Sequence, residues 1–150
     1  MGIGITIIAF FIIAYSYGTS KIAEEKQEIA NLSDESIKSM AVDWAYPDLL
    51  RNYKDYDGEI IYFRGTVTVP TTSNLVGIGV SGPRVLQVSE ENVIFVEYGE
   101  ERFLYDDEVE GFGYVDGLRE LILTKPFGGA KLTEQVPNLE GIRINCIECR

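Results

Sequence analysis

The pattern of hydrophobic and polar positions divides the chain into three segments. Residues 2–18 (GIGITIIAFFIIAYSYG) carry no charged side chain and would place Ile or Phe on every face of a helix. As a helix this run covers about 25 Å, slightly less than a hydrocarbon core of about 30 Å. Because it has no polar stripe, a membrane span is favoured over a buried core helix, and we predict a transmembrane anchor over residues 1–18.

Cleavage and orientation are separate questions for this segment. A signal peptidase would find a small-x-small site at Ala14-Tyr15-Ser16, but no basic residue precedes the apolar run. Lys21 and Lys26 follow the span, and by the positive-inside rule they favour a domain on the cytoplasmic side, although glutamates are interleaved with them. By analogy with signal-anchored proteins that have almost no N-terminal tail, we predict an uncleaved single-pass anchor and an extracytoplasmic domain.

The second segment, residues 19–46, has the composition of a helical stalk or linker. Residues 20–31 (SKIAEEKQEIAN) are rich in helix-forming residues and would continue the membrane helix. Ser33 is a candidate N-cap for another helix, whose apolar positions, including Trp44, follow helical spacing. We expect Trp44 to cap one end of the domain that follows. Pro47 then suits the first turn of a further short helix.

In the third segment, from Asp57-Gly58 onward, the hydrophobic period changes to two, which indicates β-strands. Residues 47–150 are therefore predicted to form one mainly β domain. Glycines inside the predicted strands permit tight bends, and with about five strands they favour a small closed barrel. The candidate segments for these five or so strands cover residues 60–67, 84–88, 92–98, 107–115, 118–124, 131–134 and 141–149. The glycines with an expected structural role are Gly58, Gly65, Gly111 and Gly113.

A family resemblance points to the same architecture. The stretch YPDLLRNYKDYDGEIIYFRGTVTV is similar to the entry into OB-fold domains of the tRNA-anticodon-binding type, in which a short helix, Tyr-x-Gly and a strand with Gly-x-Val follow one another. Tyr56, Gly58, Gly65 and Val67 match that pattern. DEVEGFGYVDG and INCIEC resemble later strands of those domains. The resemblance covers residues 47–149 and implies a five-stranded OB-type barrel, but it describes geometry rather than chemistry.

Charge and composition narrow the possible functions. The chain has 13 Lys and Arg against 24 Asp and Glu, a net charge of −11, and no histidine. The negative charge disfavours nucleic acid, whose binding requires clustered basic residues. Without histidine, Ser/His and Cys/His nucleophile pairs and imidazole metal ligands are excluded. No carboxylate pair has a spacing that singles it out as catalytic, and we predict a non-enzymatic protein.

The two cysteines form the motif Cys146-Ile147-Glu148-Cys149 in the last predicted strand. They could form a disulfide or remain structural thiols, provide half of a zinc or copper site shared with another chain, or act as a redox pair. Because residues three apart lie on opposite faces of a strand, a disulfide requires a turn or bulge near Glu148. We expect Cys146 to point into the barrel and Cys149 to face solvent.

An acidic cluster is a further candidate site. Four carboxylates in five residues could hold a hard cation such as Ca²⁺. Their spacing matches no EF-type loop, and alternate residues of a strand face opposite ways, so we interpret the cluster as a solvated turn. Its members are Asp106, Asp107, Glu108 and Glu110.

Residues 68–81 (TVPTTSNLVGIGVS) occupy the place of the long loop between the first two strands of an OB fold. Loops of this kind commonly contact ligands. Leu75, Val76 and Ile78 are its apolar residues, and we expect them to be exposed. In that position they would bind a protein partner or the membrane surface.

The sequence thus predicts a membrane-anchored, non-enzymatic OB-fold protein. It would serve as an accessory or assembly subunit, or as a binding module, of a membrane protein complex. Its partners would be the membrane and other membrane protein subunits, without nucleic acid and without an obligatory cofactor. The first alternative is a metal or cofactor carrier that uses the cysteine pair. The second is a single-stranded nucleic-acid binder, which the charge disfavours.

Overall fold

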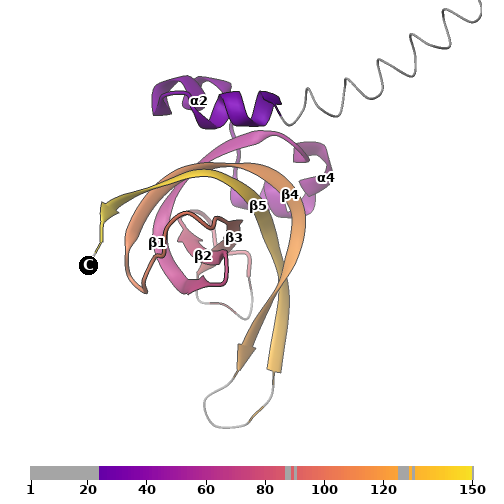
Figure 1. Cartoon of the computed structure of the whole chain (residues 1–150). Coiled ribbons are helices and arrows are strands. Elements are labelled where there is room, and N and C mark those ends of the chain that lie inside the picture. Colours follow the sequence, from indigo (N-terminus) through magenta and orange to yellow (C-terminus); the bar gives the residue numbers. More distant parts are fainter. Residues whose placement is uncertain (1–23, 87–88, 90, 125–128, 130, 150) are drawn as a thin grey trace, which may run out of the picture. The chain divides into compact units, whose positions relative to one another are not determined.

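The computed structural model describes residues 24–86, 89, 91–124, 129 and 131–149 (Figure 1). The chain divides into two compact units, residues 1–34 and residues 35–150, and the second contains all five strands. In the first unit, residues 24–30 are helical. No helix among the described residues is long and apolar enough to cross a membrane. The predicted anchor over residues 1–18 lies outside the described residues.

Three short helices precede the strands: α2 (Asp34–Met40), α3 (Tyr46–Arg51) and α4 (Tyr53–Tyr56). Pro47 stands in the first turn of α3, where its missing N–H costs nothing. Asp48 connects α3 with α4, because its carboxylate accepts hydrogen bonds from the Tyr56 hydroxyl and from the Asn52 amide (2.7 Å). These hydrogen bonds, with that from Tyr56 the stronger influence, hold the pKa of Asp48 below its usual value.

Trp44 does not lie on a helix, contrary to the expectation from its spacing. α2 ends at Met40, and the chain then runs extended beside the start of the first strand. The Val42 N–H donates to the Ile60 carbonyl (2.8 Å). The Trp44 Nε1–H donates to the Tyr62 carbonyl (2.7 Å), and its indole packs half-buried against the main core. Hydrogen bonds to a strand thus replace a further turn of helix.

Five strands form one sheet that closes in a ring, which confirms the mainly β class (Figure 1). They are β1 (Ile60–Thr72), β2 (Leu75–Val80), β3 (Asn92–Glu97), β4 (Glu108–Thr124) and β5 (Lys131–Glu148). The order around the ring is β1-β2-β3-β5-β4, and β4 pairs with β1 to complete it. β3 and β5 run parallel, and the other neighbours are antiparallel.

β2 replaces the long loop that the sequence predicted over residues 68–81. A two-residue turn, with Ser73 at φ 58°, leads from β1 directly into β2. Val76 and Ile78 are fully buried in the core and Leu75 is partly buried, so the expectation of an exposed apolar loop is wrong. Between the inward-facing Val76, Ile78 and Val80, the alternate positions of β2 are the glycines Gly77 and Gly79. Without polar side chains at those positions, the period of two is not visible in the sequence.

The last two strands each join two predicted pieces. β4 is continuous across a bend at Gly117, where φ is +71° and the register with β5 shifts. Beyond that bend, residues 118–124 of β4 pair with residues 131–137 of β5 as a two-stranded arm that extends past the ring (Figure 1). The strand predicted over residues 84–88 is wrong in its described part, since residues 84–86 lie outside the strands.

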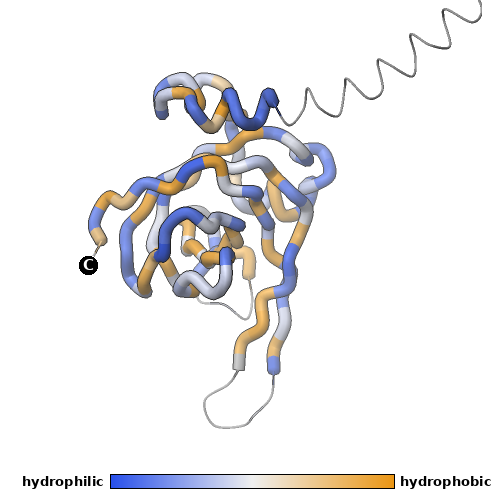
Figure 2. Tube along the Cα trace, viewed as in Figure 1, coloured by the Kyte–Doolittle hydropathy of each residue, from blue (hydrophilic) through white to orange (hydrophobic). Residues whose placement is uncertain are grey.

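The main core lies inside the ring, where alternate residues of the strands point inward. Figure 2 shows the resulting alternation of hydrophobic and hydrophilic residues along the strands. Phe63 of β1, Ile94 of β3 and Leu139 of β5 are among its fully buried side chains. Tyr46 of α3 joins them, and burial raises the pKa of its hydroxyl, which donates to the Val93 carbonyl (2.8 Å).

A smaller apolar layer covers the outer face of β1 and β4. Ile37 of α2 is fully buried and Phe112 of β4 is only 2% exposed. Neither residue belongs to the main core. The Lys38 ammonium lies 4.5 Å from the centre of the Tyr62 ring, which in turn lies 5.5 Å from that of Phe112. α2 therefore docks on the outside of the ring through apolar and cation–π contacts.

Three of the glycines singled out in the sequence occupy positions that restrict a side chain. Gly58 has φ +79° at the turn into β1, a conformation that favours glycine. A Cβ on Gly111 would lie 2.8 Å from Phe63 Cζ and closer still to a backbone carbonyl of β5. On Gly113 it would lie 3.0 Å from Leu139 Cβ. β4 therefore packs closely on its neighbours at these points.

Candidate binding groove

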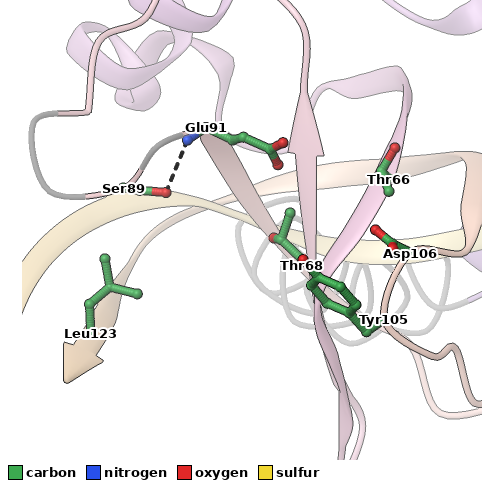
Figure 3. A pocket seen from close by; sticks show the side chains of 7 residues that line it. All are labelled: Thr66, Thr68, Ser89, Glu91, Tyr105, Asp106 and Leu123. Atoms are coloured by element: carbon green, nitrogen blue, oxygen red, sulfur yellow. Dashed lines mark hydrogen bonds between the residues drawn. The ribbon is translucent and has the colours of Figure 1, made fainter. Parts of the chain in front are cut away.

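Two adjoining cavities lie on the outer surface where β1, β2 and β3 are side by side. Together these two cavities form the groove. The first has a volume of about 360 Å³ and the second about 310 Å³. Thr66 and Glu91 line both of them. The first cavity is further lined by Thr68, Ser89, Tyr105, Asp106 and Leu123 (Figure 3), and the second by Gly79, Val80, Ser81, Gly82, Arg84 and Asn92.

The floor of the groove is made by outward positions of the sheet. Thr66 of β1 pairs with Gly79 of β2, which places a hydroxyl beside a position that has no side chain. A Cβ on Gly79 would lie 3.0 Å from Thr68 Cγ2 and 3.3 Å from the carboxylate carbon of Glu91. Because Gly79 leaves this space open, the Glu91 carboxylate lies across the sheet towards β1 (Figure 3).

The rim opposite Glu91 is a loop held tightly to β1. The Phe103 N–H donates to Thr71 Oγ1 (2.9 Å), and the Asp106 N–H donates to the Val67 carbonyl (3.0 Å). The buried Asp107 carboxylate accepts from the Leu104 N–H (2.8 Å). These bonds fix a turn that leaves two large side chains facing solvent, with Leu104 52% and Tyr105 62% exposed.

The first cavity is acidic. Glu91 and Asp106 contribute carboxylates from opposite sides, and among the described residues none of those that line this cavity is basic (Figure 3). Arg84, in the second cavity, is folded back on its own loop, where its guanidinium donates to the carbonyls of Leu86 and Ser89 (3.2 Å each). Among the described residues, no ion pair joins Arg84 to either carboxylate.

Thr68 carries a polar atom with no partner. Its Oγ1 exposes less than 1 Å² and makes no hydrogen bond among the described residues. A hydroxyl can donate one hydrogen bond and accept two. A buried polar atom without a partner costs free energy, so Thr68 is a point of reduced stability beside the groove.

The carboxylates of the acidic cluster point to different partners. Asp107 caps its own turn, Glu108 pairs with Arg64 (3.0 Å), and Glu110 accepts from the Tyr62 hydroxyl (2.6 Å). Burial and the hydrogen bond to Glu110 raise the pKa of Tyr62. Among the described residues, no group of three or more His, Cys, Asp or Glu side chains is placed to hold a metal ion. Only Asp106 of this cluster lines the groove.

Cys146 and Cys149 form a disulfide, with their Cα atoms 5.9 Å apart. Val109 of β4 pairs with Cys146 while Glu108 pairs with Glu148, so Ile147 is an extra residue on β5. The bulge that the spacing required is thus confirmed. Both cysteines are exposed, however, so the expectation that Cys146 points into the barrel is wrong. Cys146 lies two residues beyond Ile144, the last buried residue of β5, at the exposed end of the strand.

We expect removal of the disulfide to have a small effect on stability. The pair Cys146→Ser with Cys149→Ser should lower the free energy of unfolding by well below the roughly 2–4 kcal/mol of a typical native disulfide, because the closed loop is very short. Thermal unfolding of the full chain in mild detergent, with and without a reducing agent, measures this effect. A large drop in melting temperature would show that the disulfide holds the β4–β5 pairing together.

Asp106 was singled out from the sequence as a member of the acidic cluster, but the sequence did not indicate that it belongs to a groove with Thr66 and Glu91. Thr66 was interpreted as an alternating position of a strand, Thr68 as the start of the long loop, Glu91 as part of a turn, and Tyr105 as one aromatic residue among many. The one usable signal was the run Leu104-Tyr105, two large apolar residues directly before an acidic turn. Large apolar residues at the tip of a loop do not lie on a strand, so they have no inward-facing position in which they would be buried.

Fold and groove together define a closed five-stranded β domain with an acidic surface groove. Comparisons with family models, with curated proteins and with solved structures found no match for the chain. What the chain binds is therefore inferred from its own residues.

Proposed function

We propose that the chain is a membrane-anchored, non-enzymatic OB-type module that serves as an accessory or assembly subunit of a membrane protein complex, and that it binds a partner polypeptide in the groove. Five strands that close in a ring, with one parallel pair between β3 and β5, support the OB-type assignment. OB folds bind ligands on the face of their second and third strands, next to the groove described above.

The observation that carries the proposal is the groove with its exposed rim. Leu104 and Tyr105 are held outward by a hydrogen-bonded turn, and a large apolar side chain fixed in solvent is typical of an interface. The lining of the first cavity consists of hydroxyls, carboxylates and apolar groups. With no histidine in the chain, this set supports binding better than catalysis.

The predicted anchor over residues 1–18 accounts for membrane attachment. We propose an extracytoplasmic domain, because disulfides such as Cys146–Cys149 persist in oxidising compartments and are rare in the cytosol. The same bond disfavours the metal carrier, since a zinc or copper site would require both sulfurs as free thiolates. The groove carboxylates and the net charge of −11 disfavour nucleic acid.

Site-specific photo-cross-linking in the native membrane tests this function. The full chain carries p-benzoylphenylalanine in place of Tyr105, on the rim of the groove, or in place of Glu59, an exposed residue before β1 and outside the groove. We expect one discrete adduct with a membrane-complex protein from position 105 and none from position 59. The adduct should disappear when Thr66→Trp fills the groove.

Two results would contradict the proposed function. One is equal cross-linking from both positions, which would indicate random collision. The other is the absence of any adduct together with extraction of the chain as a lone monomer in every mild detergent, measured by native mass spectrometry.

A further inference from the structure

We infer that the groove binds an arginine side chain from an extended segment of the partner, with Glu91 and Asp106 as its counter-charges. This inference rests on the proposed function and specifies the chemistry of the partner. It makes the groove a pocket for a guanidinium group, flanked by an apolar rim that takes the neighbouring residues of the same segment.

The two carboxylates provide the charge. Glu91, the residue before β3, and Asp106, in the loop before β4, both contribute a carboxylate to the lining of the same cavity (Figure 3). Arg84 is engaged with backbone carbonyls and does not fill this place. The cavity of about 360 Å³ is large enough for one long side chain together with ordered water.

The shape of the acceptor set favours arginine over lysine. A guanidinium has five N–H donors in a planar fork, whereas an ammonium has three on one atom. The cavity offers acceptors from several elements: the carboxylates of Glu91 and Asp106 and the Thr66 hydroxyl. Hydrogen bonds between a charged donor and a carboxylate are stronger than neutral ones.

The apolar rim of the groove determines which residue should stand beside the arginine in the partner segment. The Tyr105 ring is available to a guanidinium through a cation–π contact. Leu123 lines the other side of the cavity, and Leu104 is exposed next to Tyr105. An apolar residue beside the arginine would bury the Leu104 and Tyr105 side chains, which are largely exposed, and would extend the contact to the partly buried Leu123. The partner segment is therefore arginine next to a large aliphatic residue, rather than a run of basic residues.

A peptide titration tests the inference. The full chain in detergent micelles, labelled with ¹⁵N, receives a capped peptide of sequence Ala-Leu-Arg-Leu-Ala, the same peptide with citrulline as the neutral isostere of arginine, or the same peptide with lysine. We expect the arginine peptide to shift the amide resonances of Thr66, Thr68 and Glu91, and to bind about tenfold more tightly than the citrulline peptide. The lysine peptide should fall between them.

Charge-matched variants separate a specific pocket from general attraction. Glu91→Gln with Asp106→Asn should abolish the preference for arginine over citrulline. Glu59→Gln with Glu120→Gln removes the same charge at exposed positions outside the groove and should preserve the preference. Equal binding of the arginine and citrulline peptides, or an equal loss in both double variants, would overturn the inference.

The two proposals fail in distinguishable ways. If position 105 cross-links to a partner and the adduct persists in Glu91→Gln with Asp106→Asn, the proposed function stands and the arginine pocket is wrong. If position 105 gives no adduct and the peptides do not discriminate, both are wrong.

Discussion

Replacing Gly65 with alanine is expected to destabilise the domain by about 4 kcal/mol or more, and valine should be worse. Gly65 lies in the middle of β1, paired with Val80 of β2 on one side and Val109 of β4 on the other. A Cβ there would lie 2.9 Å from the Gly79 carbonyl carbon and closer still to its oxygen. Because these are backbone atoms of a neighbouring strand, no side-chain rotation relieves the clash, and β1 and β2 must separate.

The measurement is thermal unfolding of the full chain in mild detergent, followed by circular dichroism. A loss of this size corresponds to a fall of about 15 °C in melting temperature for a domain of this length. Gly99→Ala is the matched control, because its Cβ would meet nothing closer than 3.6 Å and should change stability by less than about 0.5 kcal/mol. An unchanged melting temperature in Gly65→Ala would contradict the β1–β2 register.

The second large effect is expected at Asn138, which lies on β5 beside its parallel neighbour β3. Asn138 is 4% exposed and pairs with Phe95 of β3. Its Oδ1 accepts from Arg119 Nε (2.9 Å), and its amide donates to Glu97 (3.3 Å) and to the Asp116 carbonyl (3.4 Å). Asn138→Leu should cost about 2–3 kcal/mol, because it leaves these groups without their partner at a junction of three strands.

Urea unfolding of the same preparation measures this loss. Gln135→Ala is the control, since Gln135 is exposed on the same strand and should change stability by less than about 0.5 kcal/mol. A double-mutant cycle with Arg119→Met measures the interaction free energy between Arg119 and Asn138. We expect Arg119→Met to cost less stability in the Asn138→Leu background than in the unmodified chain. Additive effects would show that Arg119 and Asn138 stabilise the ring independently.

Local chemistry in the sequence decided a large part of the fold. The change of period at Asp57-Gly58 marked the start of the strands, because alternation follows directly from the geometry of a pleated strand. The spacing of Cys146 and Cys149 required a bulge for a disulfide, and the extra residue Ile147 provides it. Each of these features depends on neighbours in the chain.

Only the tertiary structure decided the identity of β2 and the location of the groove. Gly77 and Gly79 carry no side chain, so the sequence of β2 shows no alternation of apolar and polar residues. That these glycines lie in a strand becomes clear only from the tertiary structure, in which Gly79 pairs with Thr66 of β1 and Val93 of β3. The groove collects Thr66 from β1, Glu91 from the start of β3 and Asp106 from the loop before β4. These residues are far apart in the sequence, and they meet because closure of the ring fixes which strands are neighbours. A local pattern contains no information about that choice.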